Sequence, residues 1–133
     1  MAHQALLPDG WPRSLGFSNG IDAIPGHTVF VAGQIGRDPG GEIAADFAEQ
    51  FEKSLANVVA VVAAAGGRAD HLCRLTMYCT DKNGYLAAAS NFGEIWRRTM
   101  GKHFPTISLI FVSDLLQPGA QIEIEAVAVI PED

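Results

Sequence analysis

The sequence predicts an α+β fold, a two-layer sandwich in which two helices cover one face of a mixed β-sheet. Two segments carry apolar residues at helical spacing, and other segments alternate apolar and polar residues with a period of two. These segments follow one another in the order hairpin, helix, strand, helix, strand, strand, which favours two packed layers. The 133 residues suit a single domain, residues 1–133, without repeats or linkers.

The first third of the chain predicts a β-hairpin. Residues 17–24 and 28–34 resemble short strands joined through Pro25-Gly26-His27, which is a natural turn sequence. Gly33 and Gly36 lie where the second strand ends, but no helix opens there and the spacing of a dinucleotide-binding loop is absent. We therefore expect these glycines to permit close approach of neighbouring atoms rather than to hold phosphate.

Two helices are predicted from apolar stripes. The first stops at Gly66-Gly67, and its stripe consists of Phe47, Phe51, Leu55, Val58 and Val62. The second follows Asn83 and ends at Gly101, and its stripe consists of Tyr85, Ala89, Phe92, Trp96 and Met100. We expect Tyr85 and Trp96 to be core residues rather than ligand contacts.

Three further strands are predicted over residues 71–81, 106–112 and 121–129. The last of them alternates strictly, so Glu123 and Glu125 lie on one face and Ile122, Ile124 and Ala126 on the other. In residues 71–81 the polar face consists of Arg74, Thr76, Tyr78 and Thr80. With both helices on one side, this polar face is left uncovered. We expect it to be buried against other subunits, with ligand sites in clefts between them.

Charge and composition limit the partners of the chain. The formal net charge is −6 and the basic residues are scattered, so a nucleic-acid partner is not expected. Residues 1–9 lack the features of a signal peptide, and the longest apolar run, residues 58–65, is too short to cross a bilayer. Cys73 and Cys79 are predicted to be buried free thiols. These features predict a soluble cytoplasmic protein without a membrane partner.

Few kinds of chemistry are compatible with the sequence. The four histidines are dispersed and the two cysteines do not have a ligand spacing, so no metal site is expected. No serine occurs in a nucleophile motif. What remains is a carboxylate, Glu123 or Glu125, that could activate a water molecule. The structural alternative is an ion pair between these carboxylates and Arg74 on the same sheet face.

The chain resembles the RidA/YjgF superfamily, also labelled endoribonuclease L-PSP or translation inhibitor proteins, over nearly its whole length. The resemblance is carried by an ordered set of short strings: residues 15–18, residues 29–36, Gln50 with residues 55–58, residues 74–78, Phe104-Pro105-Thr106, and residues 122–128. It implies a chorismate-mutase-like fold and a homotrimer whose sheets line a central barrel. It further implies cofactor-independent hydrolysis of enamines and imines to 2-keto acids and ammonia in clefts between the subunits.

The resemblance also implies roles for individual residues. The glutamate that orients the attacking water corresponds to Glu123, which is the expected catalytic residue. Substrate-binding positions correspond to Phe17, Ala32, Gly33, Ala89, Thr106 and Ile107. The family commonly has tyrosine at the position of Phe17 and asparagine at that of Ala89.

One departure from the family pattern concerns the substrate. The arginine that clamps the substrate carboxylate is replaced by Ile107, which offers no donor. We therefore expect weak binding of ordinary 2-imino acids, unless Arg13, Arg37 or Lys102 takes the place of the arginine.

Two functions are compatible with these residues. The first is a RidA-like hydrolase that acts on a less acidic or more apolar enamine, imine or related metabolite. The second is a non-catalytic trimer that binds a small metabolite in the same clefts. A ribonuclease is disfavoured by the acidic balance and by the lack of a basic groove.

Overall fold

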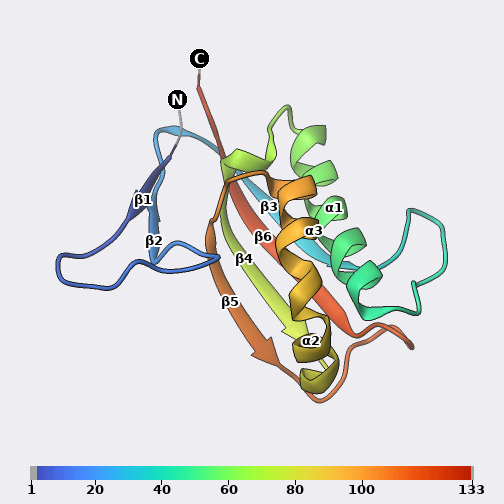
Figure 1. The fold of residues 1–133 in the computed structure, drawn as a ribbon. Helices are drawn as coiled ribbons and strands as arrows, with labels where there is room; N and C mark the ends of the chain where they lie inside the picture. Colours follow the sequence, from blue (N-terminus) through green and yellow to red (C-terminus); the bar gives the residue numbers. More distant parts are fainter. Residues whose placement is uncertain (1–2, 133) are drawn as a thin grey trace.

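The computed structural model describes residues 3–132. Its main sheet has four strands in the order β3-β6-β4-β5 (Figure 1). They are β3 (Gly26–Ile35), β4 (Leu72–Cys79), β5 (Thr106–Phe111) and β6 (Ile122–Pro131). The β3–β6 and β4–β6 pairs are antiparallel, whereas β4 and β5 are parallel. The predicted mixed sheet is therefore confirmed.

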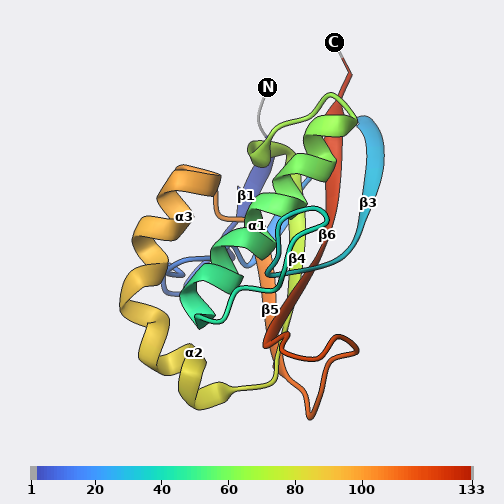
Figure 2. The ribbon, with the colours of Figure 1, turned by 90° about the vertical axis from the view of Figure 1, so that its right-hand side faces the viewer.

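Helices cover one face of this sheet, as Figure 2 shows edge-on. They are α1 (Phe47–Ala64), α2 (Lys82–Ala88) and α3 (Phe92–Met100). Asp46 caps α1, because its side chain accepts a hydrogen bond from the Glu49 N–H at 3.2 Å. The predicted stripe of α1 is buried, and Gly66 follows the helix with a φ of +86°. The core lies between this stripe and the apolar faces of β4 and β6.

Strand β6 lies inside the sheet and follows the predicted alternation closely. Ile122, Ile124, Ala126, Ala128 and Ile130 are buried under the helices, and the residues between them are partly exposed. The two glutamates therefore lie on the face opposite the helices, as predicted.

The predicted hairpin between residues 17–24 and 28–34 is wrong. Strand β2 (Gly20–Asp22) pairs instead with β1 (Gln4–Leu6), a strand that the sequence pattern did not indicate, and the two form a small separate sheet. Strand β3 pairs with β6, which offers it a partner ten residues long. Long apolar strands gain more from pairing with each other than from a short polar neighbour, so the distant partner is preferred.

The second predicted helix is interrupted. A 3₁₀ turn, η2 (Ala89–Asn91), separates α2 from α3. Ser90 and Asn91 are both weak helix formers, which favours a break at this point. Ala89 is exposed at the break, so its predicted place in the buried stripe is wrong. Phe92, Trp96 and Met100 continue the stripe on α3, as expected.

The opposite sheet face has no helix over it (Figure 2). Phe30 is 79% exposed there and Ile110 is 44% exposed, beside Arg74 and the two glutamates. Large apolar side chains of this kind, gathered on one face, are typical of a surface that binds another chain. Among the helices of residues 3–132, none has both the length and the apolarity needed to span a bilayer.

Candidate functional site

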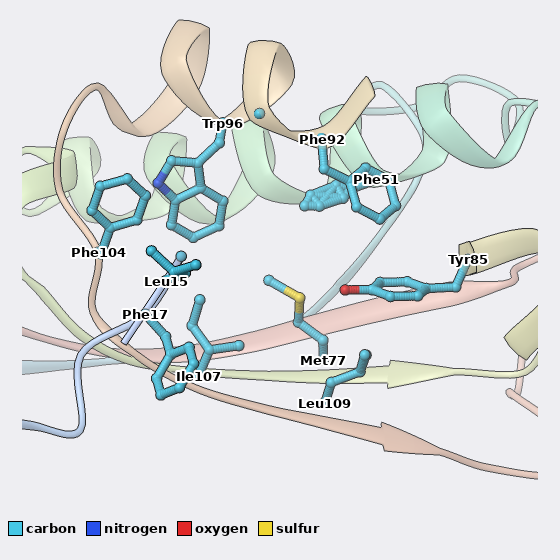
Figure 3. A pocket seen from close by; sticks show the side chains of 12 residues that line it. Leu15, Phe17, Phe51, Met77, Tyr85, Phe92, Trp96, Phe104, Ile107 and Leu109 are labelled. Atoms are coloured by element: carbon cyan, nitrogen blue, oxygen red, sulfur yellow. The ribbon is translucent and has the colours of Figure 1, made fainter. Parts of the chain in front are cut away.

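A cavity of about 440 Å³ lies between the helices and the strands β4 and β5 (Figure 3). Its walls include six aromatic side chains, which are Phe17, Phe51, Tyr85, Phe92, Trp96 and Phe104. Aliphatic and sulfur-containing side chains from the sheet and the N-terminal loop complete it: Leu15, Met77, Ile107 and Leu109. This size falls within the range of small-molecule pockets, roughly 300 to 1,000 Å³.

Ile107 and Phe17, both predicted to bind substrate, line this cavity together. Ile107 pairs with Leu75 of β4, so it lies on the helix-covered face of the sheet. The loop that carries Phe17 is fixed beside β5, because the Ser18 N–H donates to the Pro105 carbonyl at 3.0 Å. The Ser18 hydroxyl also donates to the Phe104 carbonyl.

No charged side chain lines the cavity within residues 3–132. Arg13, Arg37 and Lys102, the candidates to replace the missing arginine, are all exposed and none is among the lining residues. Arg37 lies instead in a separate groove between the end of β3 and helix α1. Among the described residues of this chain, no cationic side chain therefore takes the place of the missing arginine beside Ile107.

Glu123, the predicted catalytic residue, packs directly against Gly33. A Cβ atom at residue 33 would overlap Oε2 of Glu123, so only glycine leaves room for the carboxylate there. The register of β3 shifts between Val31 and Gln34, which places this glycine in an irregularity of the strand. The expectation that Gly33 and Gly36 allow close approach is confirmed, because Gly36 also lies against the backbone of Gln50.

The second glutamate is held differently. The Tyr78 hydroxyl donates to Glu125 Oε1 at 2.7 Å, and this hydrogen bond raises the pKa of Tyr78, with burial and the charge of Glu125 adding to it. By contrast, Glu123 makes no hydrogen bond or ion pair through its side chain with any residue in 3–132. Nor does Arg74 form the alternative ion pair with either glutamate within that range. The Glu123 carboxylate is thus left available to a ligand or water.

The remaining predicted positions are spread around the sheet. Ala32 borders a hollow of about 520 Å³ on the uncovered face, together with Arg74 and Glu125. Thr106 lies next to Arg74 in register, and its hydroxyl donates to the Cys73 carbonyl at 2.7 Å. Ala89 is exposed at the helix break and does not line the cavity.

Within one chain the predicted site is therefore divided by the sheet. Phe17 and Ile107 lie on the side of the helices, whereas Glu123 lies on the opposite face, where it pairs in register with Tyr78. A small molecule in the cavity of one chain would be separated from that chain's Glu123 by the sheet itself.

Two polar side chains of α1 brace the strand ends around Glu123. Gln50 is 1% exposed; its amide donates to the carbonyls of Ala44 and Gly119, and its oxygen accepts from the Gln121 N–H at 2.8 Å. Asn57 donates to the carbonyl of Arg37 at 2.8 Å. These bonds fix the start of β6 and the end of β3, between which Glu123 and Gly33 meet.

Two histidines hydrogen-bond to the backbone, and both cysteines are free thiols. His103 bonds to the Leu72 carbonyl at 2.6 Å, and His71 accepts from the Arg68 N–H at 3.0 Å. Cys79 is buried and Cys73 half-buried; both are free thiols, and burial raises the pKa of each. No three His, Cys, Asp or Glu side chains of the described chain gather in a group that could hold a metal ion.

Comparison with known proteins identifies the family. Residues 13–130 match the family model of endoribonuclease L-PSP. The chain belongs to this family. It is the RidA/YjgF superfamily that the sequence strings resemble, so that prediction is confirmed.

Three relatives show how far the similarity extends. TdcF of Escherichia coli is 35% identical over 89% of this chain and 90% of its own. Its crystal structure with bound serine superposes with a TM-score of 0.70 and covers 96% of this chain and 99% of TdcF. The 2-iminobutanoate/2-iminopropanoate deaminase of Escherichia coli is 33% identical over 95% of this chain and 97% of its own. YyfB of Yersinia pestis, from the Rid family, is 29% identical with a TM-score of 0.82 over 98% of this chain and all of its own.

This RidA/YjgF member contains lining residues that the sequence pattern did not reveal. Tyr85 and Trp96 pack in or against the core, as expected, but both also line the cavity. Met77 and Leu109 do the same from the strands. Periodicity shows only which side of an element is apolar, so it cannot separate a packed face from one that borders a cavity.

Proposed function

We propose that this RidA/YjgF member is a cofactor-independent hydrolase of a small, uncharged imine or enamine. In this proposal the chain is a homotrimer, and water attacks the substrate in clefts between the subunits. Membership of the family and its similarity to a 2-iminobutanoate/2-iminopropanoate deaminase support the reaction type. The residues of the cavity support the change of substrate.

The proposal rests on one observation, the placement of Glu123 and Ile107 on opposite faces of the sheet. A cavity and a carboxylate separated in this way act on the same molecule only if a second copy of the chain supplies one of them. The exposed apolar residues of the uncovered face, such as Phe30, support such an assembly. Each cleft would then combine the aromatic cavity of one subunit with Glu123 of its neighbour.

Glu123 has the properties that a water-activating carboxylate needs. Gly33 leaves room for its carboxylate, and its oxygens are not engaged in hydrogen bonds within residues 3–132. In the reaction, the water oxygen bonds to the imine carbon while Glu123 accepts a proton from the water. That proton then passes to nitrogen and gives a carbinolamine. Transfer of the remaining hydroxyl proton to the amino group lets the carbon–nitrogen bond break, so that ammonia and a carbonyl product leave.

The substrate is expected to lack a carboxylate. Moving a carboxylate from water into an apolar cavity is costly unless a cation or several donors receive it. Ile107 and Phe17 provide neither, and no charged side chain of the described residues lines the cavity. A neutral substrate avoids this cost, so the replacement of the arginine changes the preferred substrate without removing the water-activating group.

The proposal is tested with two matched imines. Butan-2-imine and 2-iminobutyrate differ only in a methyl group in place of the carboxylate, and ammonia release above the buffer rate reports hydrolysis of both. We expect the neutral imine to be hydrolysed at least about tenfold more efficiently. Glu123→Gln should lower kcat for it by about a hundredfold or more. Glu125→Gln is the matched control, because Glu125 is already engaged by Tyr78.

Two results would contradict the proposal that this protein is a hydrolase. Equal activity of Glu123→Gln and the parent would show that Glu123 does not activate the attacking water. Saturable binding without any ammonia release would favour the second candidate, a trimer that binds a small metabolite without converting it. Calorimetric titration with acetophenone, a neutral ligand with a carbonyl group, separates this outcome from a simple lack of binding.

A further inference from the structure

The cavity has an aromatic wall along its helical side. The rings of Phe51 and Phe92 stack with centroids 4.4 Å apart and an interplanar angle of 17°. The Tyr85 ring follows at 5.0 Å from that of Phe92. These three rings come from three different helices, α1, α3 and α2, so the wall forms where these helices pack together.

The other end of the cavity is also aromatic but offers no free polar group. Trp96 and Phe104 stack with centroids 5.9 Å apart and nearly parallel planes. The indole N–H of Trp96 donates to the His103 carbonyl at 2.9 Å and is therefore already used. Leu15 and Ile107 lie beside this end, as Figure 3 shows, and add only apolar surface.

Tyr85 places a hydroxyl group in this otherwise apolar cavity. Its hydroxyl points into the cavity toward Met77 (Figure 3). The hydrogen bonds found within residues 3–132 include none from this hydroxyl, whereas the hydroxyl of Tyr78 is bonded to Glu125. Burial raises the pKa of Tyr85, which favours its neutral form as a donor. The cavity thus has apolar walls and one unused hydroxyl at one end.

We infer that this cavity selects a neutral molecule with an aromatic ring, and that the Tyr85 hydroxyl donates a hydrogen bond to its carbonyl oxygen or imine nitrogen. The ring would lie against Trp96 and Phe104, and the polar atom would face Tyr85. The inference rests on the proposed function in that it names the ligand class of the same cleft. Tyr85 acts here as a specificity-determining residue, distinct from Glu123.

The test uses three probes with one skeleton. Ethylbenzene has the ring alone, acetophenone adds a carbonyl acceptor, and phenylglyoxylate carries a carboxylate in place of the methyl group of acetophenone. Calorimetric titration of the purified protein gives their dissociation constants without requiring turnover. We expect acetophenone to bind more tightly than ethylbenzene. Phenylglyoxylate should bind at least about tenfold more weakly than acetophenone, because no charged side chain of the described residues lines the cavity.

Tyr85→Phe isolates the hydroxyl with almost no change in shape. It should weaken acetophenone binding about five- to tenfold, the effect of losing one hydrogen bond, and leave ethylbenzene binding unchanged. Ser54→Ala is the control, because it removes a buried hydroxyl of α1 that does not line the cavity and should leave both dissociation constants unchanged.

Three outcomes would overturn the inference. They are the absence of saturable acetophenone binding, equal affinity for phenylglyoxylate and acetophenone, and an unchanged acetophenone affinity in Tyr85→Phe. The hydrolase proposal is judged separately by ammonia release from butan-2-imine. Turnover of butan-2-imine without acetophenone binding would overturn only the inference about the ligand class. Acetophenone binding with the expected effect of Tyr85→Phe, but without turnover of butan-2-imine, would overturn only the hydrolase proposal.

Discussion

The carboxylate of Glu123 lies so close to Gly33 that a single methyl group at residue 33 would occupy the position of Oε2. Gly33 does not have a positive φ, so its value here is its lack of a side chain rather than its backbone freedom. The contact joins the irregular end of β3 to the central strand β6. The missing side chain of Gly33 leaves the space that the Glu123 carboxylate occupies.

Gly33→Ala should therefore displace the carboxylate without unfolding the protein, because the atoms it meets belong to the end of a side chain. We expect kcat/KM for butan-2-imine to fall about a hundredfold, as for a catalytic group misplaced by about 1 Å. Gly41→Ala is the control, since its Cβ would come no closer than 3.3 Å to any neighbour and Gly41 lies in a different loop. Comparable activity of Gly33→Ala and the parent would show that the contact does not position Glu123.

Ile107→Arg should restore turnover of charged substrates. A guanidinium in the cavity would pair with a carboxylate, so activity toward 2-iminobutyrate and 2-aminoacrylate should rise about a hundredfold. Turnover of butan-2-imine should fall in the same variant. Ile107→Met controls for the change in shape. Strong activity of the parent on both acids would mean that another cation already serves this role.

Gln50→Leu should destabilise the fold by about 3 kcal/mol. It would leave the part-buried Gln121 N–H and the carbonyls of Ala44 and Gly119 without their partner. Ser54, on the same helix, has a buried hydroxyl without a hydrogen-bond partner in the described chain, so Ser54→Ala should be neutral or stabilising. Urea unfolding of the two variants tests the contrast, and equal destabilisation would contradict it.

His71 should make stability depend on pH. Burial lowers its pKa below the usual 6.5, and its Nδ1 must be unprotonated to accept from the Arg68 N–H. The unfolded chain therefore binds more protons than the folded one in this range. The contribution is full above about pH 6.5 and is lost as the pH falls through the lower folded pKa. Unfolding free energies measured from about pH 7.5 to pH 5 should decline less steeply in His71→Gln than in the parent; parallel curves would exclude His71 as the cause.

The sequence alone determined the elements whose signal is local and long. Helix α1 and strand β6 were predicted because each repeats its apolar residues over many positions, and burial against one core preserves that period. The order of elements also indicated the two layers and the uncovered face. Glu123 could be assigned to that face from alternation alone.

The tertiary structure decided what depends on contacts between distant segments. Strand β3 pairs with β6 rather than with its neighbour in sequence, and the second helix is interrupted at Ala89–Asn91, where weak helix formers lie. The cavity combines side chains from the N-terminal loop, three helices and two strands, and Tyr85 faces a cavity only because these segments meet. Periodicity records which side of an element avoids water, but strand partners, cavities and free hydroxyls arise from long-range packing, which a one-dimensional pattern does not encode.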